Sequence, residues 1–394
     1  MKVIMTGGGT GGHIYPAVAI ADKIRRKNPE AEILFVGTAR GMEKDLVPKS
    51  GYPIQFITVS GFHRKKLWKN VKTVADLLKG DREARRIIKE FQPDMVIGTG
   101  GYVCGPVVRA ACKLGIPAYI HEQNAVPGVT NKMLEKYVDK VFISFPEAGA
   151  HFKRKEKLVV SGNPIRKSFL TAGAMDYRQR LGLSDRDFVV LCFGGSLGAG
   201  KINSTMKSVA AAVNGMEDLK LFFITGKIYF ERIQRELEDS GIRLRDNVKL
   251  MAYADNIHEY LSSADLVISR AGALTVSEIT ACGKASILVP SPNVTGNHQF
   301  FNAKVVADRG GAILIEEKDL DDEKLLSAIL RLKSNKELLN AMAKASSRAG
   351  RLDAVDVIYD HLHWAGDGRE GERGRERTGR SRRKGRSPSE KDEG

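Results

Sequence analysis

Short apolar runs alternate with amphipathic stretches along most of the chain, and glycines or polar residues follow many of these runs. A short continuous apolar run is typical of a strand buried on both faces of a parallel sheet. The predicted strands are residues 2–6, 33–36, 95–97, 118–121, 141–144, 158–160, 188–193, 221–224, 248–251, 265–268, 285–289 and 312–315. Helical stretches such as 16–27 separate them, so the pattern predicts an α/β fold with parallel sheets.

The strand, glycine loop and helix at the start of the chain occur again in its second half. GGGTGGH follows the first strand, and GGSLGA follows the strand at 188–193. A chain of 394 residues is also too long for one ordinary core. We therefore expect two Rossmann-like domains facing a cleft, residues 1–162 and 163–349, with SGNPIR (161–166) as the crossover between them.

Composition narrows the range of partners. The formal net charge of +16 favours nucleic acid, anionic lipid or a phosphorylated substrate. Four cysteines without a CxxC pair are typical of a reducing compartment. From the few apolar residues before the first glycines we expect no signal peptide, and without an apolar run of about 20 residues we expect no membrane-spanning helix.

The last residues form a separate segment. Residues 365–394 contain Gly, Arg, Glu and Ser but almost no apolar side chains. Such a segment buries too little surface to offset the entropy lost on ordering, so we expect a disordered charged tail. An arm that binds RNA or lipid is the alternative interpretation.

The stretch from Ser269 to Ala303 contains the strongest candidate chemistry. A strand ends there in small residues, and a short helix over 274–281 follows, whose bare N-terminus suits an anion. Glu278 can accept two hydrogen bonds from a ribose diol, and Gln299 and Asn302 offer donors and acceptors to sugar hydroxyls. These features favour a nucleotide-sugar site. The alternative is a carboxylate on a solvated helix face beside a polar loop.

The first glycine loop fits G-x-G-x-x-G at Gly7, Gly9 and Gly12, which is the pattern of dinucleotide-binding sites. That interpretation requires an acidic residue at the tip of the second strand. Residues 37–40 after that strand are Gly, Thr, Ala and Arg, so NAD is disfavoured. The loop keeps the glycines for close approach to a phosphate, and His13 lies at the entrance of the helix.

Residues 60–90 are rich in Lys and Arg, and apolar residues recur among them at helical spacing around Trp68. A basic amphipathic segment with a Trp is typical of binding to an anionic membrane surface. A helix that packs its apolar face on its own sheet explains the same spacing. Trp68 favours the membrane interpretation.

Six motifs together resemble one family. They are GGGTGGHIYPAVAIA, GTGGYVCGP, HEQNAVPG, GNPIR, GGSLGA, and SRAGALTVSE with GNHQFFNA, and they lie in that order between Met1 and about His363. This arrangement resembles the peptidoglycan GlcNAc transferases, which convert lipid I to lipid II on the cytoplasmic face of the membrane. The resemblance implies the GT-B glycosyltransferase fold, with a final helix at about 350–364 that crosses back to the first domain.

The resemblance also implies an inverting enzyme that acts peripherally at the membrane. It would transfer GlcNAc from UDP-GlcNAc to the C4 hydroxyl of MurNAc in undecaprenyl-diphospho-MurNAc-pentapeptide (lipid I), with no cofactor, no metal and no nucleic acid. The Asp-x-Asp at Asp319 and Asp321 is expected to cap a helix. The expected donor contacts are Thr10, Gly11, Gly12, Asn124, Arg166, Ser196, Ala254, Ala273, Leu274, Thr275, Val276, Ser277, Glu278 and Gln299, and the expected acceptor contacts are Tyr102 and Asn131.

A sugar hydroxyl attacks poorly unless a positioned base takes its proton. His13 is the first candidate because an imidazole accepts a proton near neutral pH. Glu122 is the second, either as the base or as the group that orients His13. The third interpretation has His13 as a helix cap and Glu122 as a ligand of its own loop.

Two other functions remain open. A related enzyme with the same donor site, such as a glycolipid-forming transferase or a UDP-GlcNAc epimerase, would differ on the acceptor side. A nucleotide-sugar or anionic-lipid binding module without activity would need the site of one domain alone.

Overall fold

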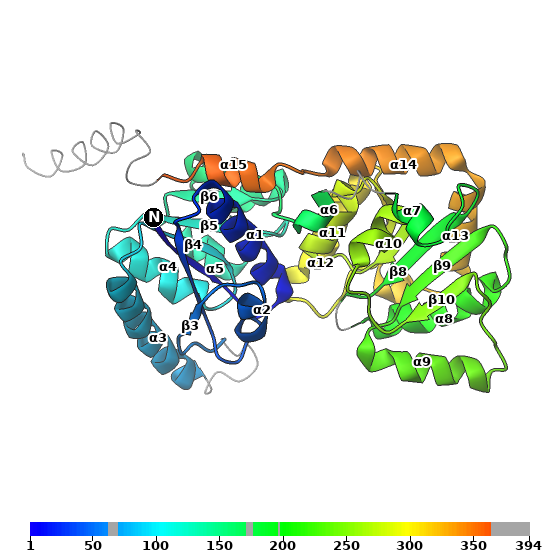
Figure 1. Cartoon of the computed structure of the whole chain (residues 1–394), viewed down its shortest axis with the longest axis horizontal. Coiled ribbons are helices and arrows are strands. Elements are labelled where there is room, and N and C mark those ends of the chain that lie inside the picture. The colour runs from blue at the N-terminus through cyan, green and yellow to red at the C-terminus, as the bar shows by residue number, and fades with distance from the viewer. Residues whose placement is uncertain (62–69, 171–175, 196–197, 364–394) are drawn as a thin grey trace, which may run out of the picture.

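A computed structural model describes residues 1–61, 70–170, 176–195 and 198–363. The chain forms two halves that lie side by side, each built from a parallel sheet with helices on both faces (Figure 1). The expected fold class, two Rossmann-like units in the GT-B arrangement, is confirmed.

The first sheet has the order β3-β2-β1-β4-β5-β6-β7, with all pairs parallel. Its strands are β1 (Lys2–Gly7), β2 (Glu32–Gly37), β3 (Ile54–Phe56), β4 (Met95–Gly100), β5 (Ala118–Glu122), β6 (Lys140–Ile143) and β7 (Leu158–Val160). Its helices are α1 (Gly11–Lys27), α2 (Glu43–Lys49), α3 (Asn70–Phe91), α4 (Cys104–Lys113) and α5 (Val129–Leu134).

Alternate side chains of these strands belong to two cores. Ile4 and Val96 pack with residues of α3, α4 and α5 on one face. Val3 and Met95 pack with residues of α1 and α2 on the other. The strands are apolar on both sides because both faces are covered, which is why they appear in the sequence as continuous apolar runs.

The second sheet repeats this plan in the order β10-β9-β8-β11-β12-β13. Its strands are β8 (Phe188–Phe193), β9 (Leu219–Ile224), β10 (Val248–Met251), β11 (Leu266–Ser269), β12 (Ala285–Leu288) and β13 (Ala312–Leu314). Its helices are α6 (Lys167–Leu170), α7 (Tyr177–Arg180), α8 (Gly200–Val213), α9 (Lys227–Asp239), α10 (Ile257–Ser263), α11 (Ala273–Ala281), α12 (His298–Asp308), α13 (Asp322–Ser334) and α14 (Lys336–Ala349).

The last helix, α15 (Ala354–Asp360), belongs to the layer of the first half (Figure 1). Ile358 lies in the same core as α1, and Asn28 donates to the hydroxyl of Tyr359 at 2.9 Å. The expected return of the chain to the first half over residues 350–364 is therefore confirmed as far as residue 363.

Some element boundaries differ from the predicted ones. Helix α1 begins at Gly11 rather than near Pro16, because the carbonyl of Thr10 already accepts from the backbone of His13 and Ile14. Pro16 marks a helix start in many sequences, yet here it stands within the helix. The short edge strand β3 and helix α2 were not predicted.

Both sheets reverse their strand order at one point, between β1 and β4 and between β8 and β11. In open α/β sheets, ligands bind outside the carboxyl ends of the strands at such a switch point. The motifs GGGTGGH and GTGG flank the first switch point, and GGSLGA and SRAGALT flank the second. Topology therefore places the predicted motif loops where a ligand is expected.

Within the described ranges no helix is long and apolar enough to cross a membrane. The residues 62–69 of the predicted basic segment, Trp68 included, and the tail from 365 lie outside the described residues.

Candidate active site

Helix α11 contains the predicted donor run from Ala273 to Glu278. Its N-cap is Gly272, which has an extended backbone and no side chain to cap the helix. The first turn contains no acidic residue. The free N–H groups and the positive dipole end are therefore available to an anion such as a diphosphate.

Glu278 lies further along α11 and forms an ion pair with the crossover. Its Oε1 accepts from Nε of Arg166 at 3.1 Å and from Nη2 at 2.9 Å. The Glu278 side chain is buried, and this burial raises its pKa against the opposing effect of Arg166. No donor among the described residues reaches Oε2, which remains an acceptor for a hydroxyl group.

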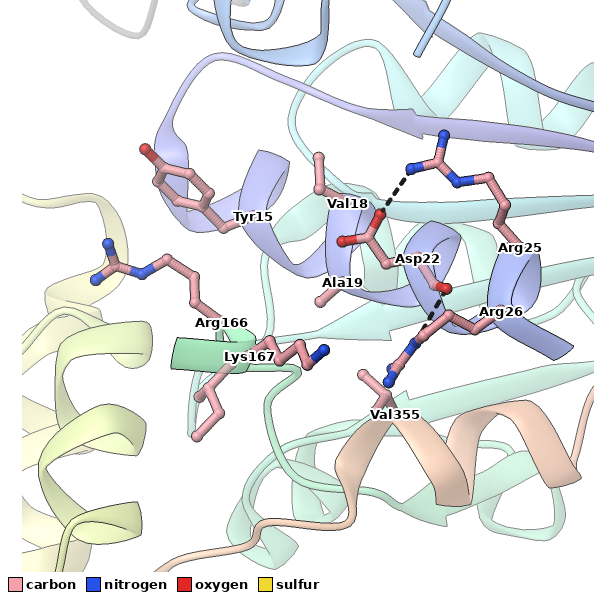
Figure 2. A pocket seen from close by; sticks show the side chains of 10 residues that line it. Tyr15, Val18, Ala19, Asp22, Arg25, Arg26, Arg166, Lys167 and Val355 are labelled. Carbon is pink, nitrogen blue, oxygen red and sulfur yellow. Dashed lines mark hydrogen bonds and ion pairs between the residues drawn. The ribbon is translucent and has the colours of Figure 1, made fainter. Parts of the chain in front are cut away.

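Arg166 was expected to reach a phosphate, but its guanidinium is held at Glu278 instead. It lies 4.8 Å from the ring centre of Phe169 and 5.5 Å from that of Tyr15 on α1. Figure 2 shows the guanidinium directed toward Tyr15 and away from Arg25 and Arg26. Arg166 thus contacts side chains from both halves, and the phosphate contact stays a prediction.

A cavity of about 380 Å³ lies beside Arg166, between α1 and the crossover (Figure 2). Its lining residues are Tyr15, Val18, Ala19, Asp22, Arg25, Arg26, Ile165, Arg166, Lys167 and Val355. Arg166 is the one predicted site residue among them, so this cavity is not the space between the glycine loops.

The first glycine loop is occupied by a carboxylate that the sequence analysis missed. Glu43 is fully buried and accepts from Gly9 N at 2.9 Å, from Thr38 N at 2.9 Å and from Thr38 Oγ1 at 2.7 Å. A Cβ at Gly8 or Gly41 would fall within 2.4 Å of this carboxylate. Gly8 and Gly41 therefore make room for the Glu43 carboxylate.

Replacing Glu43 by Ala is expected to lower the free energy of unfolding of the first half by on the order of 3 kcal/mol. The N–H groups of Gly9 and Thr38 and the Thr38 hydroxyl lose their shared acceptor in this variant, and removing a buried carboxylate that accepts several hydrogen bonds costs more than a surface change. Hydrogen exchange of β1 and β2 amides would measure it, with the exposed Glu30→Ala as the control. Equal protection in both variants would contradict this role.

His13 lies in the first turn of α1 and faces two acceptors. Its Nδ1 is 3.1 Å from the Thr99 carbonyl and 3.0 Å from Oε1 of Gln123. A carbonyl can only accept, so Nδ1 carries the proton of the neutral ring and Nε2 is the basic nitrogen. The loops that follow β1 and β4 meet here, since Gly8 N also donates to the Gly100 carbonyl at 3.2 Å.

Glu122, the second candidate base, holds its own loop. Oε1 accepts from Asn124 N and Nδ2 at 2.9 and 3.0 Å, and Oε2 accepts from Gly128 N and Asn131 Nδ2 at 3.0 and 2.8 Å. Glu122 is also 2% exposed. A carboxylate with two donors on each oxygen is poorly suited to take another proton, so the geometry favours the loop-ligand interpretation.

Two amides have structural contacts in place of the ligand contacts expected of them. Asn131 is buried and donates to Glu122 and to the His121 carbonyl, so it supports the loop between β5 and α5. Asn302 is fully buried and bridges the halves, because it accepts from Ala125 N at 2.9 Å and donates to Asn124 at 3.2 Å. Its predicted contact with a sugar is corrected accordingly.

The other predicted residues lie around these loops. Tyr102 follows β4 and is 62% exposed, and Gln299 on α12 accepts from Ser291 N at 2.9 Å. Ala254 lies between β10 and α10 and is half-buried. Thr10 is the exposed N-cap of α1, ahead of Gly11 and Gly12 in its first turn. Ser196 lies outside the described residues.

The chain matches two family models, one in each half. The glycosyltransferase family 28 N-terminal domain matches residues 3–143, and the C-terminal domain of the same family matches residues 189–358. The chain belongs to glycosyltransferase family 28. Both switch points and the loops described above lie within the matched ranges.

Relatives match the sequence and the structure of this family 28 glycosyltransferase over nearly its whole length. It is 46% identical to the UDP-N-acetylglucosamine--N-acetylmuramyl-(pentapeptide) pyrophosphoryl-undecaprenol N-acetylglucosamine transferase of Alkaliphilus metalliredigens, over 91% of this chain and 98% of the relative. The crystal structure of Acinetobacter baumannii MurG is 31% identical with a TM-score of 0.74, over 91% of this chain and 98% of that one.

A UDP-GlcNAc 2-epimerase of Neisseria meningitidis, solved with UDP-GlcNAc, matches the fold of this family 28 glycosyltransferase with a TM-score of 0.66. It covers 91% of this chain and 99% of its own, at 13% identity. At that identity the likeness concerns the fold alone, so it does not favour the epimerase alternative.

The Asp-x-Asp that follows β13 was expected to cap a helix. This is confirmed for Asp321, which is the N-cap of α13 and accepts from Lys324 N at 2.8 Å. In the described part of the chain, no group of three or more His, Cys, Asp or Glu side chains is placed to hold a metal ion.

We expect glycosyl transfer to continue at an unchanged rate in EDTA, because backbone amides at α11 are available to the leaving diphosphate. The assay is initial rate of UDP release with and without chelator, with Mg²⁺ added back as the control. A strict requirement restored by Mg²⁺ would contradict this expectation.

Proposed function

We propose that this enzyme transfers GlcNAc from UDP-GlcNAc to the C4 hydroxyl of MurNAc in undecaprenyl-diphospho-MurNAc-pentapeptide, with inversion, releasing lipid II and UDP. Residues 163–349 would bind the donor, and residues 1–162 with the returning helix would bind the acceptor. The enzyme would act peripherally at the cytoplasmic face of the membrane. The observation that carries the proposal is the 46% identity, across both halves, to transferases named for this reaction.

The residues proposed to bind the donor would assist the departure of UDP. Displacement at the anomeric carbon passes through an oxocarbenium-like state, while negative charge grows on the diphosphate. The uncapped first turn of α11 would stabilise that charge, and each preorganised donor contributes about 3 kcal/mol. Oε2 of Glu278 would accept from the ribose hydroxyls, with Arg166 keeping the carboxylate in place.

The acceptor side explains attack by the sugar hydroxyl. Nε2 of His13 would take the proton of the MurNAc hydroxyl as the bond to the anomeric carbon forms. The exposed ring of Tyr102 borders the same switch point and offers a surface for the acceptor. Glu122 would keep the loop between β5 and α5 in shape.

Release of UDP with and without lipid I tests this function. The expected result is UDP and lipid II in equal amounts, with no turnover of UDP-GlcNAc alone. Conversion of UDP-GlcNAc without an acceptor would favour an epimerase. Transfer to a different lipid would favour a glycolipid-forming transferase, and binding without turnover would favour a non-enzymatic module.

The first half also presents an exposed apolar surface, missed in the sequence, that would contact the membrane. Val129, Met133 and Tyr137 recur four residues apart and are 63%, 66% and 45% exposed. Lys132 and Lys136 flank them, and Nζ of Lys136 lies 4.8 Å from the ring centre of Tyr137. Apolar side chains bordered by lysines are typical of a surface that inserts into an anionic bilayer interface.

This surface lies on the same side of the first half as α3, since α3 and α5 cover the same face of the sheet (Figure 1). Leu78 on α3 is 61% exposed there. The membrane contact predicted for residues 60–90 would thus continue onto α5.

The double variant Val129→Ser/Met133→Ser is expected to bind anionic vesicles about tenfold more weakly, because two apolar side chains no longer enter the interface. Binding should also weaken as salt is raised. Sedimentation with vesicles measures both effects. The matched control is Ile228→Ser, which changes an exposed apolar side chain of the second half. Equal binding by all three proteins would exclude α5 from the membrane contact.

A further inference from the structure

A line of hydrogen bonds runs from His13 into the interior of the first half. It passes through Gln123 and His121, which follow one another closely at the end of β5, and it ends at the Gly162 carbonyl in the crossover. Gln123 is 2% exposed and His121 is fully buried. None of the functions derived above uses these two side chains.

The amide of Gln123 has one orientation that satisfies its neighbours. Its Nε2 lies 2.6 Å from the Thr99 carbonyl, 3.3 Å from the His121 carbonyl and 2.9 Å from Nδ1 of His121. Exchanging the two ends of the amide would set its oxygen against two carbonyl oxygens, which is repulsive. Nε2 therefore faces inward, and Oε1 faces Nδ1 of His13 at 3.0 Å.

His121 fixes this orientation from beneath. Its Nε2 lies 3.0 Å from the Gly162 carbonyl, which can only accept, so Nε2 carries the ring proton and Nδ1 accepts from Gln123. Burial lowers the pKa of His121 to about 4, so the ring is neutral under physiological conditions. Every bond in the line then donates in the same direction, from His13 to Gly162.

The position of Gln123 is held through its backbone as well. Nδ2 of Asn163 in the crossover donates to the Gln123 carbonyl at 3.1 Å and to Oγ of Ser277 on α11 at 2.9 Å. Gly100 leaves no room for a side chain beside the imidazole, since a Cβ there would lie 2.5 Å from Nδ1 of His13. Both Gly100 and Gln123 therefore restrict the ring of His13 at Nδ1.

We propose that Gln123 is a positioning residue, held by His121, that keeps the proton of His13 on Nδ1 and so leaves Nε2 free to accept the proton of the attacking hydroxyl. The inference rests on the proposed role of His13 as the base. When Nε2 takes the proton, the imidazolium charge is stabilised by Oε1 of Gln123 and the Thr99 carbonyl. Glu122 acts electrostatically on His121, and His298 and His13 are close enough to interact in the same way.

Nitrogen NMR of the full-length enzyme labelled with ¹⁵N-histidine tests the arrangement without any assay of activity. The expected spectrum shows the Nδ1–H tautomer for His13 and the Nε2–H tautomer for His121, assigned by loss of signals in His13→Asn and His121→Gln. An Nε2–H tautomer for His13 in the wild-type enzyme would overturn the proposal.

Two variants at position 123 then separate positioning from a merely structural role. Gln123→Leu removes the acceptor, so kcat should fall roughly ten- to a hundredfold and its acid limb should move to lower pH. Gln123→Glu keeps an acceptor toward Nδ1 of His13, and its other oxygen can donate to the Thr99 carbonyl when it is protonated, so its acid limb should return toward that of the wild type, with kcat above that of the Leu variant. If the acid limbs of the kcat profiles of the two variants lie at the same pH, the proposal is overturned. If instead His13→Asn retains kcat, the base assignment falls while the tautomer result stands.

Discussion

Replacing His13 by Asn is expected to lower kcat at saturating substrates by at least about a hundredfold, since a positioned base contributes typically 10²- to 10⁴-fold. The acid limb of the kcat profile should disappear with it, because the group that must be deprotonated is gone. Asn can still occupy the first turn of α1 beneath the Thr99 carbonyl, so the fold should persist. Steady-state kinetics across pH measure both effects.

The matched variant is Glu122→Gln, which tests the other candidate base. Its new amide would face two backbone or side-chain donors, so the loop should loosen and stability should fall by about 2 kcal/mol. Acceptor KM should rise, and the acid limb should remain. A His13→Asn variant with near-normal kcat and a raised acceptor KM would make His13 a binding residue.

Replacing Glu278 by Gln is expected to weaken UDP binding by about 1.5 to 3 kcal/mol, which is roughly ten- to a hundredfold in Kd. The variant loses the charged acceptor proposed for the ribose and leaves Arg166 without its partner, so the diphosphate side is disturbed as well. Isothermal titration calorimetry with UDP measures the loss.

The control for this variant is Glu259→Gln. Glu259 is also buried in the second half and pairs with an arginine, Arg180, at 3.2 Å. The Glu259→Gln variant should lose a comparable ion pair, and its affinity for UDP should equal that of the wild type. Unchanged affinity in Glu278→Gln would remove this carboxylate from the donor site.

The strands could be predicted because both sheets are covered on both faces. Residues 188–193 and 158–160 are apolar without interruption, and the predicted bounds match β8 and β7. The edge strand β3 was missed because its side chains are largely exposed, so its pattern carries little signal. The glycine motifs marked loop positions correctly, since each follows a strand that ends at a switch point.

The partners of the charged groups could not be predicted in the same way. Glu43 lies 34 residues from Gly9, and Glu278 lies 112 residues from Arg166, so no local pattern links them. Gln123 was visible within HEQNAVPG, but its role depends on which atoms of Thr99 and His121 surround it. Burial and hydrogen-bond direction arise only when the chain is folded.

The glycosidic linkage in the product formed from UDP-GlcNAc and lipid I shows whether this enzyme transfers GlcNAc with inversion. The donor sugar is α-linked to the diphosphate, and direct attack by the MurNAc hydroxyl inverts that centre. NMR of the isolated product should therefore show a β-linked GlcNAc on the C4 oxygen of MurNAc, formed in the amount of UDP released. An α linkage, a different acceptor oxygen, or an epimerised nucleotide sugar without transfer would contradict the account.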